Sequence, residues 1–332
     1  MGGLSMDRRR FLEFNIGLAA AAAAGVMPAG AQSGWPTKNI TMIVPFTPGG
    51  STDILARLIG QRFTEAWGQG VVTENRPGAG GSVGSVALAR APADGYTVGM
   101  GHIGTLSVNP SLYPNLQYDP IKSFAHISML ARVYNVLVVH PSLPIRNVRE
   151  FIDYARANPG KLNYGSGGNG SAAHIATAAF MVATGTQMTH VPYRGTAPAV
   201  ADLLSGQIQF MMTGGPAVLP HARAGTMRAL GVSGPNRLKS DPDIPTIAEA
   251  GVPGFDATQW YGMMAPAGTP DEIVGKFTKE VHAALASKPM QEALERDGAE
   301  PWPTTPQEFR DIIASETKRW HEVVVKAKIK VE

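Results

Sequence analysis

The 332-residue chain contains no cysteine. This absence excludes disulfides, metal sites built on thiolates, catalysis by a cysteine nucleophile and a lipidated N-terminal cysteine. The chain is also poor in charge, since charged residues make up 17% of it and the formal net charge is +3. So small an excess of positive charge gives no electrostatic reason to expect nucleic acid as a partner. After residue 31, no apolar run approaches the roughly 20 residues of a membrane span.

Two motifs with specific spacing are missing as well. No glycine-rich loop ends in Gly-Lys-Ser or Gly-Lys-Thr, as a P-loop does. The eight histidines show no close ligand spacing, and Val325 stands four positions after His321, where a helical zinc site needs its second histidine. We therefore expect neither a metal nor a cofactor.

The first 31 residues have the pattern of an export signal. A basic cluster at residues 8–10 precedes a short apolar run at residues 16–26, and residues 29–31 (AGA) are small enough for cleavage. The sequence RRRFL at residues 8–12 resembles a twin-arginine signal, and the alternative is an ordinary secretory signal with a strongly basic end. We predict a signal peptide over residues 1–31 and export of the mature chain.

The mature chain repeats a short apolar strand, a glycine-rich turn and a helix. The first unit is an apolar strand at residues 40–46, the turn PFTPGGSTD at residues 45–53 and a helix that begins at Ser51 or Thr52. Similar turns precede helices at residues 75–82, 165–171 and 194–196. Short strands that alternate with helices predict an α/β fold of parallel units.

Two segments depart from this pattern and predict passages between two sheets. Residues 124–140 are rich in strand formers with no helix between them, so we place a crossing near Ala131 and Arg132. Residues 256–265 read as an extended return crossing, and the rest of the chain is helical in pattern. The predicted division is a signal peptide at residues 1–31, domain 1 from residues 32–131 and 256–332, and domain 2 from residues 132–255.

The four turns are suited to binding anions. Each leaves backbone N–H groups uncovered at the positive end of a helix dipole, and Ser, Thr and Asp are the residues that cap helix starts. With two turns in each predicted domain, a dicarboxylate could be held at both ends. Hydrogen bonds to a charged group contribute roughly 1.5–3 kcal/mol each, so a few suffice for micromolar capture at about −8 kcal/mol. Closure of two lobes around such a ligand would be a hinge motion.

Two segments also resemble enzyme motifs. Residues 80–84 (GGSVG) fit the nucleophile elbow around Ser82, but residues 76–79 separate the motif from the strand that an elbow requires. Residues 165–170 (GSGGNG) fit a dinucleotide loop, but the first acidic residue after it is Asp202, too far along the chain to bind the ribose. An exported hydrolase and a nucleotide-binding protein remain the rival hypotheses.

Single side chains give weaker signals. His102 lies at a strand end, where ligand sites form in α/β sheets, and the alternative is a solvated turn residue. Arg194 is either a carboxylate clamp or half of a surface ion pair. His174, in the first turn of a helix, reads as a packing group, and Phe46 reads as core that could also cover a ligand.

Several segments together resemble the Bug family, the periplasmic solute receptors of tripartite tricarboxylate transporters. The resemblance covers the whole mature chain, and the order and spacing of its motifs make it specific. They are PFTPGGSTD at 45–53, NRPGAGG at 75–81, ADGY at 93–96, GSGGNGS at 165–171, VPYRG at 191–195, DLLSG at 202–206, PTIAEAG at 245–251, WYG at 260–262 and APAGTP at 265–270.

The resemblance implies a two-lobed type II periplasmic-binding-protein fold, with the two crossing segments as its hinge, and no catalysis. It further implies a monomeric periplasmic receptor that captures a small carboxylate and delivers it to membrane transporter subunits or to a sensor. From the turns and the resemblance together we predict contacts to the ligand from Phe46, Thr47, Gly49, Gly50, Ser51, Asp53, Gly81, Ser82, His102, Thr105, Ser166, Asn169, Ser171, Arg194, Gly195 and Thr196. His102 stands where small hydroxyl residues would be expected, so the choice among citrate-like, amino-acid, aromatic and dicarboxylate ligands stays open.

Overall fold

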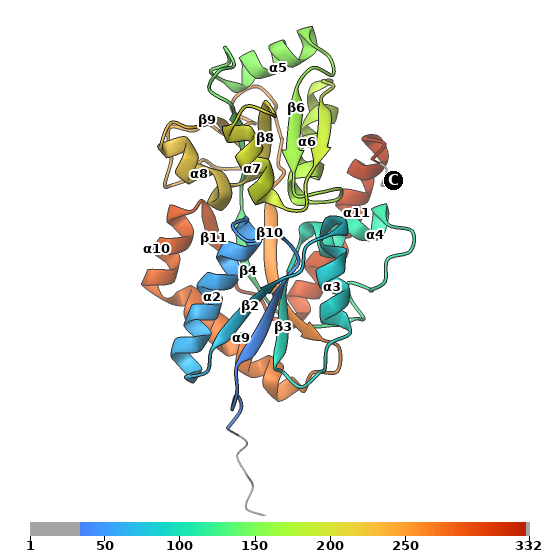
Figure 1. Ribbon diagram of the computed structural model, residues 1–332, viewed down its shortest axis with the longest axis vertical. Coiled ribbons are helices and arrows are strands. Elements are labelled where there is room, and N and C mark those ends of the chain that lie inside the picture. The colour runs from blue at the N-terminus through green and yellow to red at the C-terminus, as the bar shows by residue number, and fades with distance from the viewer. Residues whose placement is uncertain (1–33, 330–332) are drawn as a thin grey trace, which may run out of the picture. The chain divides into compact units, whose positions relative to one another are not determined.

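The computed structural model describes residues 34–329, and the signal peptide predicted over residues 1–31 lies outside them. The chain from Lys38 onward builds two mixed sheets, each covered by helices (Figure 1). We call the six-stranded sheet and its helices lobe 1, and the five-stranded sheet and its helices lobe 2. Among the described residues, no helix has both the length and the apolar character that crossing a bilayer requires.

Lobe 1 combines the start of the chain with its end. Its strands occur in the order β11-β4-β10-β3-β1-β2, with β1 parallel to both β2 and β3 and β10 antiparallel to both β3 and β4. The strands are β1 (Ile40–Val44), β2 (Val71–Asn75), β3 (Thr97–His102), β4 (Phe124–Val133), β10 (Gln259–Pro266) and β11 (Ala299–Pro301). The helices are α2 (Ser51–Trp67), α3 (Ser82–Ala89), α4 (Asn109–Leu112), α9 (Asp271–Ala286), α10 (Lys288–Arg296) and α11 (Pro306–Lys326), with a 3-10 turn η1 (Ala79–Gly81) and a π-helix η2 (Gly104–Val108).

Lobe 2 is built from the middle of the chain. Its strands occur in the order β7-β6-β8-β5-β9, where β6 is parallel to β7 and β8, and β5 is antiparallel to β8 and β9. The strands are β5 (Asn135–Val139), β6 (Asn163–Ser166), β7 (Thr189–Pro192), β8 (Phe210–Gly214) and β9 (Arg228–Val232), and the helices are α5 (Val148–Ala157), α6 (Ala172–Thr184), α7 (Thr196–Leu204) and α8 (Gly215–Arg223). Every residue of β5 is buried, as expected for a strand with helices on both faces.

The local signals in the sequence account for these elements. Gly68 ends α2 with φ +68°, a left-handed conformation that glycine adopts without strain. Thr305 and Glu308 form a reciprocal capping box at the start of α11. A helix was predicted to begin at Ser51 or Thr52, and it begins at Ser51, but the prediction of a side-chain cap there is wrong. Gly50 is the N-cap, and Ser51 already lies in the first turn of the helix.

The chain passes between the sheets at two adjacent places. Val133 ends β4 and Asn135 begins β5, so Tyr134 alone makes the first passage. The second passage leads into β10, which inserts between β3 and β4 with its eight residues all buried. Because β4, β10 and β11 pair antiparallel, the lobe 1 sheet is mixed rather than purely parallel, which corrects the expectation of parallel units alone. The α/β class is confirmed.

Candidate functional site

A small cavity lies between the ends of the two lobes. It measures about 20 Å³, room for about one water molecule. Lobe 1 lines it from the start of α2, the end of β3 and the start of β10, and lobe 2 lines it from the starts of α6 and α7 and the end of β8. The lining residues are Phe46, Gly50, Ser51, Thr52, His102, Gly167, Ser171, Ala172, Ala173, Thr196, Thr213, Gln259 and Tyr261.

Three helix N-termini meet at this cavity. Ser51 and Thr52 are the first residues of α2, Ala172 and Ala173 the first of α6, and Thr196 the first of α7. The first N–H groups of a helix have no carbonyl partner within it, and the dipole makes this end positive. No Asp, Glu, Lys or Arg is among the lining residues, so no side-chain charge offsets these dipoles. The cavity therefore suits an anion bound by backbone N–H and hydroxyl groups.

The cavity is small because loops of the two lobes touch around it. A Cβ atom added at Gly195 of lobe 2 would lie 1.9 Å from Oγ1 of Thr47 in lobe 1, and one added at Gly80 would lie 2.2 Å from the carbonyl oxygen of Asn169. The Tyr113 hydroxyl donates a hydrogen bond of 3.1 Å to the same carbonyl of Asn169. The two lobes thus meet closely on two sides of the cavity.

His102 presents a neutral imidazole to the cavity. Its ring stacks on Phe46 with 4.6 Å between the ring centroids, and the backbone N–H of Thr105 donates to its Nδ1 at 3.1 Å. Burial lowers the pKa of His102 to about 4, so the ring is uncharged at neutral pH. Since Nδ1 accepts a hydrogen bond, the remaining proton lies on Nε2, and the ring can donate from that atom. His102 therefore offers a donor without a charge.

Strand β10 supplies two polar side chains on its cavity face. The buried Tyr261 hydroxyl donates to Oε1 of Gln259, and Nε2 of Gln259 donates to Oδ1 of Asn135 at 2.6 Å. Asn135 in turn donates to the carbonyl oxygen of Ala257 at 2.6 Å. Burial raises the pKa of Tyr261 well above its usual value, so the hydroxyl keeps its proton. This chain of hydrogen bonds connects the cavity wall to both passages between the lobes.

Asp53 stabilises the turn at residues 45–53 through hydrogen bonds to its carboxylate. Its carboxylate accepts hydrogen bonds from Gly49 N at 3.0 Å, Arg57 Nε at 2.9 Å and Asn75 Nδ2 at 2.9 Å. Asn75 also donates to the carbonyl oxygen of Phe46. Burial raises the pKa of Asp53, but the hydrogen bonds from Arg57, Gly49 and Asn75 outweigh that effect and hold the pKa below its ordinary value. Asp53 is ionised at neutral pH and braces the turn from Phe46 to Gly49.

A stack of histidines supports the loop at residues 165–171. The rings of His174 and His190 lie parallel with 4.0 Å between centroids, and Tyr164 also stacks on His190, with 4.9 Å between centroids. The Ser166 hydroxyl lies 2.6 Å from Nε2 of His190, and Gly170 N donates to Nδ1 of His174. Burial lowers the pKa of His174 to about 4 and that of His190 to about 3. His174 is thus a structural group, as its position in the sequence indicated.

The predicted site residues fall into two groups. Six of them line the cavity: Phe46, Gly50, Ser51, His102, Ser171 and Thr196. The other ten lie in the surrounding loops or behind them: Thr47, Gly49, Asp53, Gly81, Ser82, Thr105, Ser166, Asn169, Arg194 and Gly195. Arg194 is exposed and has no hydrogen-bond or ion-pair partner among residues 34–329.

Seven lining residues were not predicted from the sequence. They are Thr52, Gly167, Ala172, Ala173, Thr213, Gln259 and Tyr261. Thr52, Gly167 and the two alanines adjoin predicted residues, so a wider window around each turn would have found them. A polar Gln259 at the start of an otherwise apolar strand was a usable signal. Thr213 lies within the apolar strand β8, and no pattern in the sequence marks it as a site residue.

The enzyme-like patterns do not assemble a reactive site. Strand β2 ends at Asn75, six residues before Gly81. The Ser82 hydroxyl accepts a hydrogen bond from Asn109, and within residues 34–329 no histidine is placed to accept its proton. Asp202, the first acidic residue after the loop at residues 165–171, accepts a hydrogen bond from the Tyr193 hydroxyl at 2.6 Å. Within residues 34–329 no three His, Asp or Glu side chains gather as a metal site would require.

The chain matches known proteins over most of its length. The family model of the tripartite tricarboxylate transporter family receptor matches residues 55–329. BugT of Bordetella pertussis is 39% identical over 310 residues, which cover 93% of this chain and 95% of BugT.

Two solved structures from Rhodopseudomonas palustris share the fold. A protein solved with adipate is 41% identical with a TM-score of 0.87, covering 89% of this chain and 99% of its own. MatC, solved with bound malate, is 33% identical with a TM-score of 0.82, covering 87% of this chain and 100% of its own. The two-lobed periplasmic-binding-protein fold expected from the sequence is confirmed. The chain belongs to the tripartite tricarboxylate transporter receptor family and is one of its Bug-type solute-binding receptors.

Proposed function

We propose that this protein captures a small carboxylate in the cavity between its lobes and delivers it to the membrane subunits of a tripartite tricarboxylate-type transporter. The observation that carries the proposal is the meeting of three helix N-termini at a cavity whose lining has no charged side chain. A cation would be repelled by three positive dipole ends, and a neutral ligand would leave them uncompensated. An anion is the ligand that this arrangement favours.

The ligand is a carboxylate rather than an arbitrary anion on two grounds. Donors reach the cavity from both lobes, with Ser51, Thr52 and His102 on one side and Thr196 on the other, which suits the two ends of a di- or tricarboxylate. The relatives solved with adipate and malate hold molecules of this kind. An amino acid or an aromatic acid also presents a carboxylate, and the same N–H groups would bind it.

The binding cycle is a hinge movement. The domain boundaries predicted from the sequence, residues 32–131 with 256–332 and residues 132–255, fall within three residues of the passages at Tyr134 and before Gln259, and these passages form the hinge. A cavity of about 20 Å³ is too small to admit a dicarboxylate, so the lobes separate to let the ligand enter and close around it. The groups around the ligand then bind it without performing chemistry on it.

The protein works in the periplasm as a monomer. Residues 1–31 direct its export, and Arg8→Lys with Arg9→Lys distinguishes the two routes, because only twin-arginine export requires the arginine pair. Retention of the variant inside the cell indicates the twin-arginine route. Export unchanged by the substitutions indicates the general secretory route.

A thermal-unfolding screen tests the ligand class. The purified mature protein is heated alone and with malate, adipate, citrate, an amino acid or an aromatic acid, with sulfate as the anion control. A ligand at 100 times its dissociation constant adds about 2.7 kcal/mol to the free energy of unfolding. At least one carboxylate should raise the melting temperature well beyond sulfate. A panel in which no carboxylate does so contradicts the proposal.

A further inference from the structure

A second, larger cavity lies on the opposite face of strand β10, the strand that follows the second passage between the lobes. It measures about 320 Å³, within the range of small-molecule sites. Successive side chains of a strand point to opposite faces, so Trp260 of β10 faces this cavity while its neighbours Gln259 and Tyr261 face the cavity between the lobes. We call it the hinge cavity. Its lining residues are Arg132, Tyr134, Pro235, Asp256, Thr258, Trp260, Trp302, Ile312, Ser315, Glu316 and Arg319.

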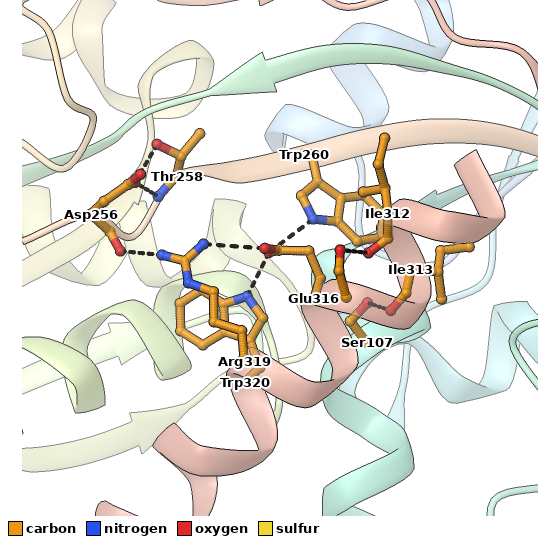
Figure 2. A network of polar contacts seen from close by, with 10 residues as sticks. Ser107, Asp256, Thr258, Trp260, Ile312, Ile313, Glu316, Arg319 and Trp320 are labelled. Carbon is orange, nitrogen blue, oxygen red and sulfur yellow. Dashed lines mark hydrogen bonds and ion pairs between the residues drawn. The ribbon is translucent and has the colours of Figure 1, made fainter. Parts of the chain in front are cut away.

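Both acidic residues of the hinge cavity accept hydrogen bonds from other residues of the protein, as Figure 2 shows. Glu316 accepts hydrogen bonds from the indole N–H groups of Trp260 at 3.3 Å and Trp320 at 2.9 Å, and from Arg319 at 3.2 Å. Asp256 accepts from the backbone N–H and the hydroxyl of Thr258, at 2.8 and 2.6 Å. Glu316 therefore has little capacity left to attract a cation, whereas the exposed Asp256 accepts these bonds on Oδ1 alone.

Arg319 is occupied as well, because it also donates to the carbonyl oxygen of Asp256 at 2.6 Å and so ties α11 to the second passage. Arg132 differs from the other three charged residues. Its side chain is exposed, and its guanidinium lies 3.8 Å from the ring centroid of Trp302. Among residues 34–329 it has no hydrogen-bond or ion-pair partner, so its N–H donors are available.

The free guanidinium and the aromatic walls define a ligand chemistry. An arginine fork pairs best with a planar oxyanion such as a carboxylate. Trp260 and Trp302 add aromatic surface, against which a flat ring packs favourably. We propose that the hinge cavity is a second binding site, for a small aromatic carboxylate, and that its occupation favours closure of the cavity between the lobes.

The direction of the coupling follows from the geometry. The hinge cavity is bordered by both passages, by Pro235 of the segment that follows β9 in lobe 2, and by α11 and Trp302 of lobe 1. Rotation about the passages that separates the lobes on one face of β10 brings them together on the other. A molecule in the hinge cavity resists that rotation and so holds the first cavity closed. By reciprocity, each ligand then tightens the binding of the other.

Benzoate is the probe for the test. The chain has five tryptophans, so its amide NMR spectrum contains five indole N–H signals, which single Trp→Phe variants assign. Benzoate should shift the signals of Trp260 and Trp302 with a dissociation constant of about 1 mM, a weak affinity typical of a small fragment. Arg132→Gln should weaken that binding at least about tenfold, because it removes a charge-assisted pair.

Two controls make the result specific. Arg149→Gln removes another exposed arginine, from α5 in lobe 2, and should leave the benzoate titration unchanged. Trp302→Leu removes the stacking partner of Arg132 and should weaken benzoate as well, which provides a second variant if Arg132→Gln folds poorly. Absence of any shift at Trp260 and Trp302 overturns the site. Shifts that persist equally in Arg132→Gln also overturn it, because they would report benzoate in the other cavity.

The coupling is measured separately and rests on the proposed function. With benzoate saturating, the dissociation constant of the carboxylate found in the thermal screen should fall about fivefold, a typical size for such coupling. An unchanged constant overturns the coupling. If the screen finds no carboxylate, the proposed function fails, while the indole signals still report on the hinge cavity.

Discussion

Gln259 donates a hydrogen bond of 2.6 Å to Asn135, and this contact joins the two passages through which the chain moves between its lobes. Both side chains are buried, and Asn135 donates a further hydrogen bond to the carbonyl oxygen of Ala257. At the other end, Gln259 accepts from the Tyr261 hydroxyl at the cavity wall. The hinge is therefore held by a chain of directed polar contacts as well as by apolar packing.

Replacing Asn135 with alanine should destabilise the protein by about 2–4 kcal/mol, because the Gln259 amide loses its acceptor while it remains buried. Urea unfolding of the mature protein measures the change. Asn115→Ala, at an exposed position, should change the free energy of unfolding by less than about 0.5 kcal/mol. Equal stability of the two variants would show that the buried contact contributes nothing.

Asp53→Ala should weaken carboxylate binding about tenfold although Asp53 does not line the cavity. The substitution removes the acceptor for Gly49 N and Asn75, so the turn from Phe46 to Gly49 loses its brace. Calorimetric titration gives the affinity. Glu65→Ala removes an exposed carboxylate from the same helix and should leave the affinity unchanged. A wild-type affinity in Asp53→Ala would refute the bracing role.

Gly195→Ala should hinder closure of the lobes. Its Cβ would lie 1.9 Å from Thr47 Oγ1 and 2.9 Å from Thr47 N, so the two loops could no longer approach as they do. Since the clash exists only in the closed form, carboxylate affinity should fall at least about tenfold with little loss of stability in the free protein. Titration and unfolding curves separate the two effects.

Gly275→Ala is the matched control, because a Cβ added there meets open space on α9. It should bind ligand as the wild type does. If Gly195→Ala also binds normally, the close approach of the two loops has no part in ligand capture.

The stability of the protein should fall as the pH drops below about 6.5. Burial lowers the pKa of His102 and His174 to about 4 and that of His190 to about 3 in the folded protein. The unfolded chain, with histidine pKa values near 6.5, therefore takes up protons first as the pH falls. Each of these histidines should cost about 1 kcal/mol of stability by pH 5.5, with the loss growing toward the folded pKa.

His190→Gln tests the source of this pH dependence, because glutamine can keep a hydrogen bond to Ser166 without titrating. The slope of stability against pH between about 6 and 4 should decrease by about 1 kcal/mol per unit. His321→Gln, at an exposed position, should leave the slope as it is. A slope unchanged in His190→Gln would assign the acid sensitivity to other groups.

Much of this arrangement was predictable because the sequence marks its turns strongly. Glycine and proline place the loops at residues 45–53, 165–171 and 194–196, and each precedes a helix as predicted. The three helix starts that line the cavity could thus be located from the sequence alone. The start of α3 at Ser82 was located in the same way, but Ser82 does not line the cavity.

The remainder depended on tertiary structure. Gln259 and Tyr261 reach the cavity because β10 inserts between β3 and β4, strands more than 120 residues earlier, and no local pattern specifies that insertion. His102, predicted at a strand end with a solvated turn as the alternative, is the buried last residue of β3, and the π-helix η2 that follows places the buried Thr105 against it. The hinge cavity is formed by residues from α11, β4 and β10 together, and its pattern is equally invisible in the sequence.

The most direct test of the central claim is a calorimetric titration of the mature protein with malate, adipate and citrate, repeated with the methyl ester of each ligand that binds. The charge of the carboxylate should carry the binding, through the N–H groups at three helix N-termini. At least one acid should bind one molecule per chain with a dissociation constant of about 1 μM, and its ester should bind at least about a hundredfold more weakly. If no acid binds, or if the ester binds as tightly as the acid, the cavity between the lobes is not a carboxylate site.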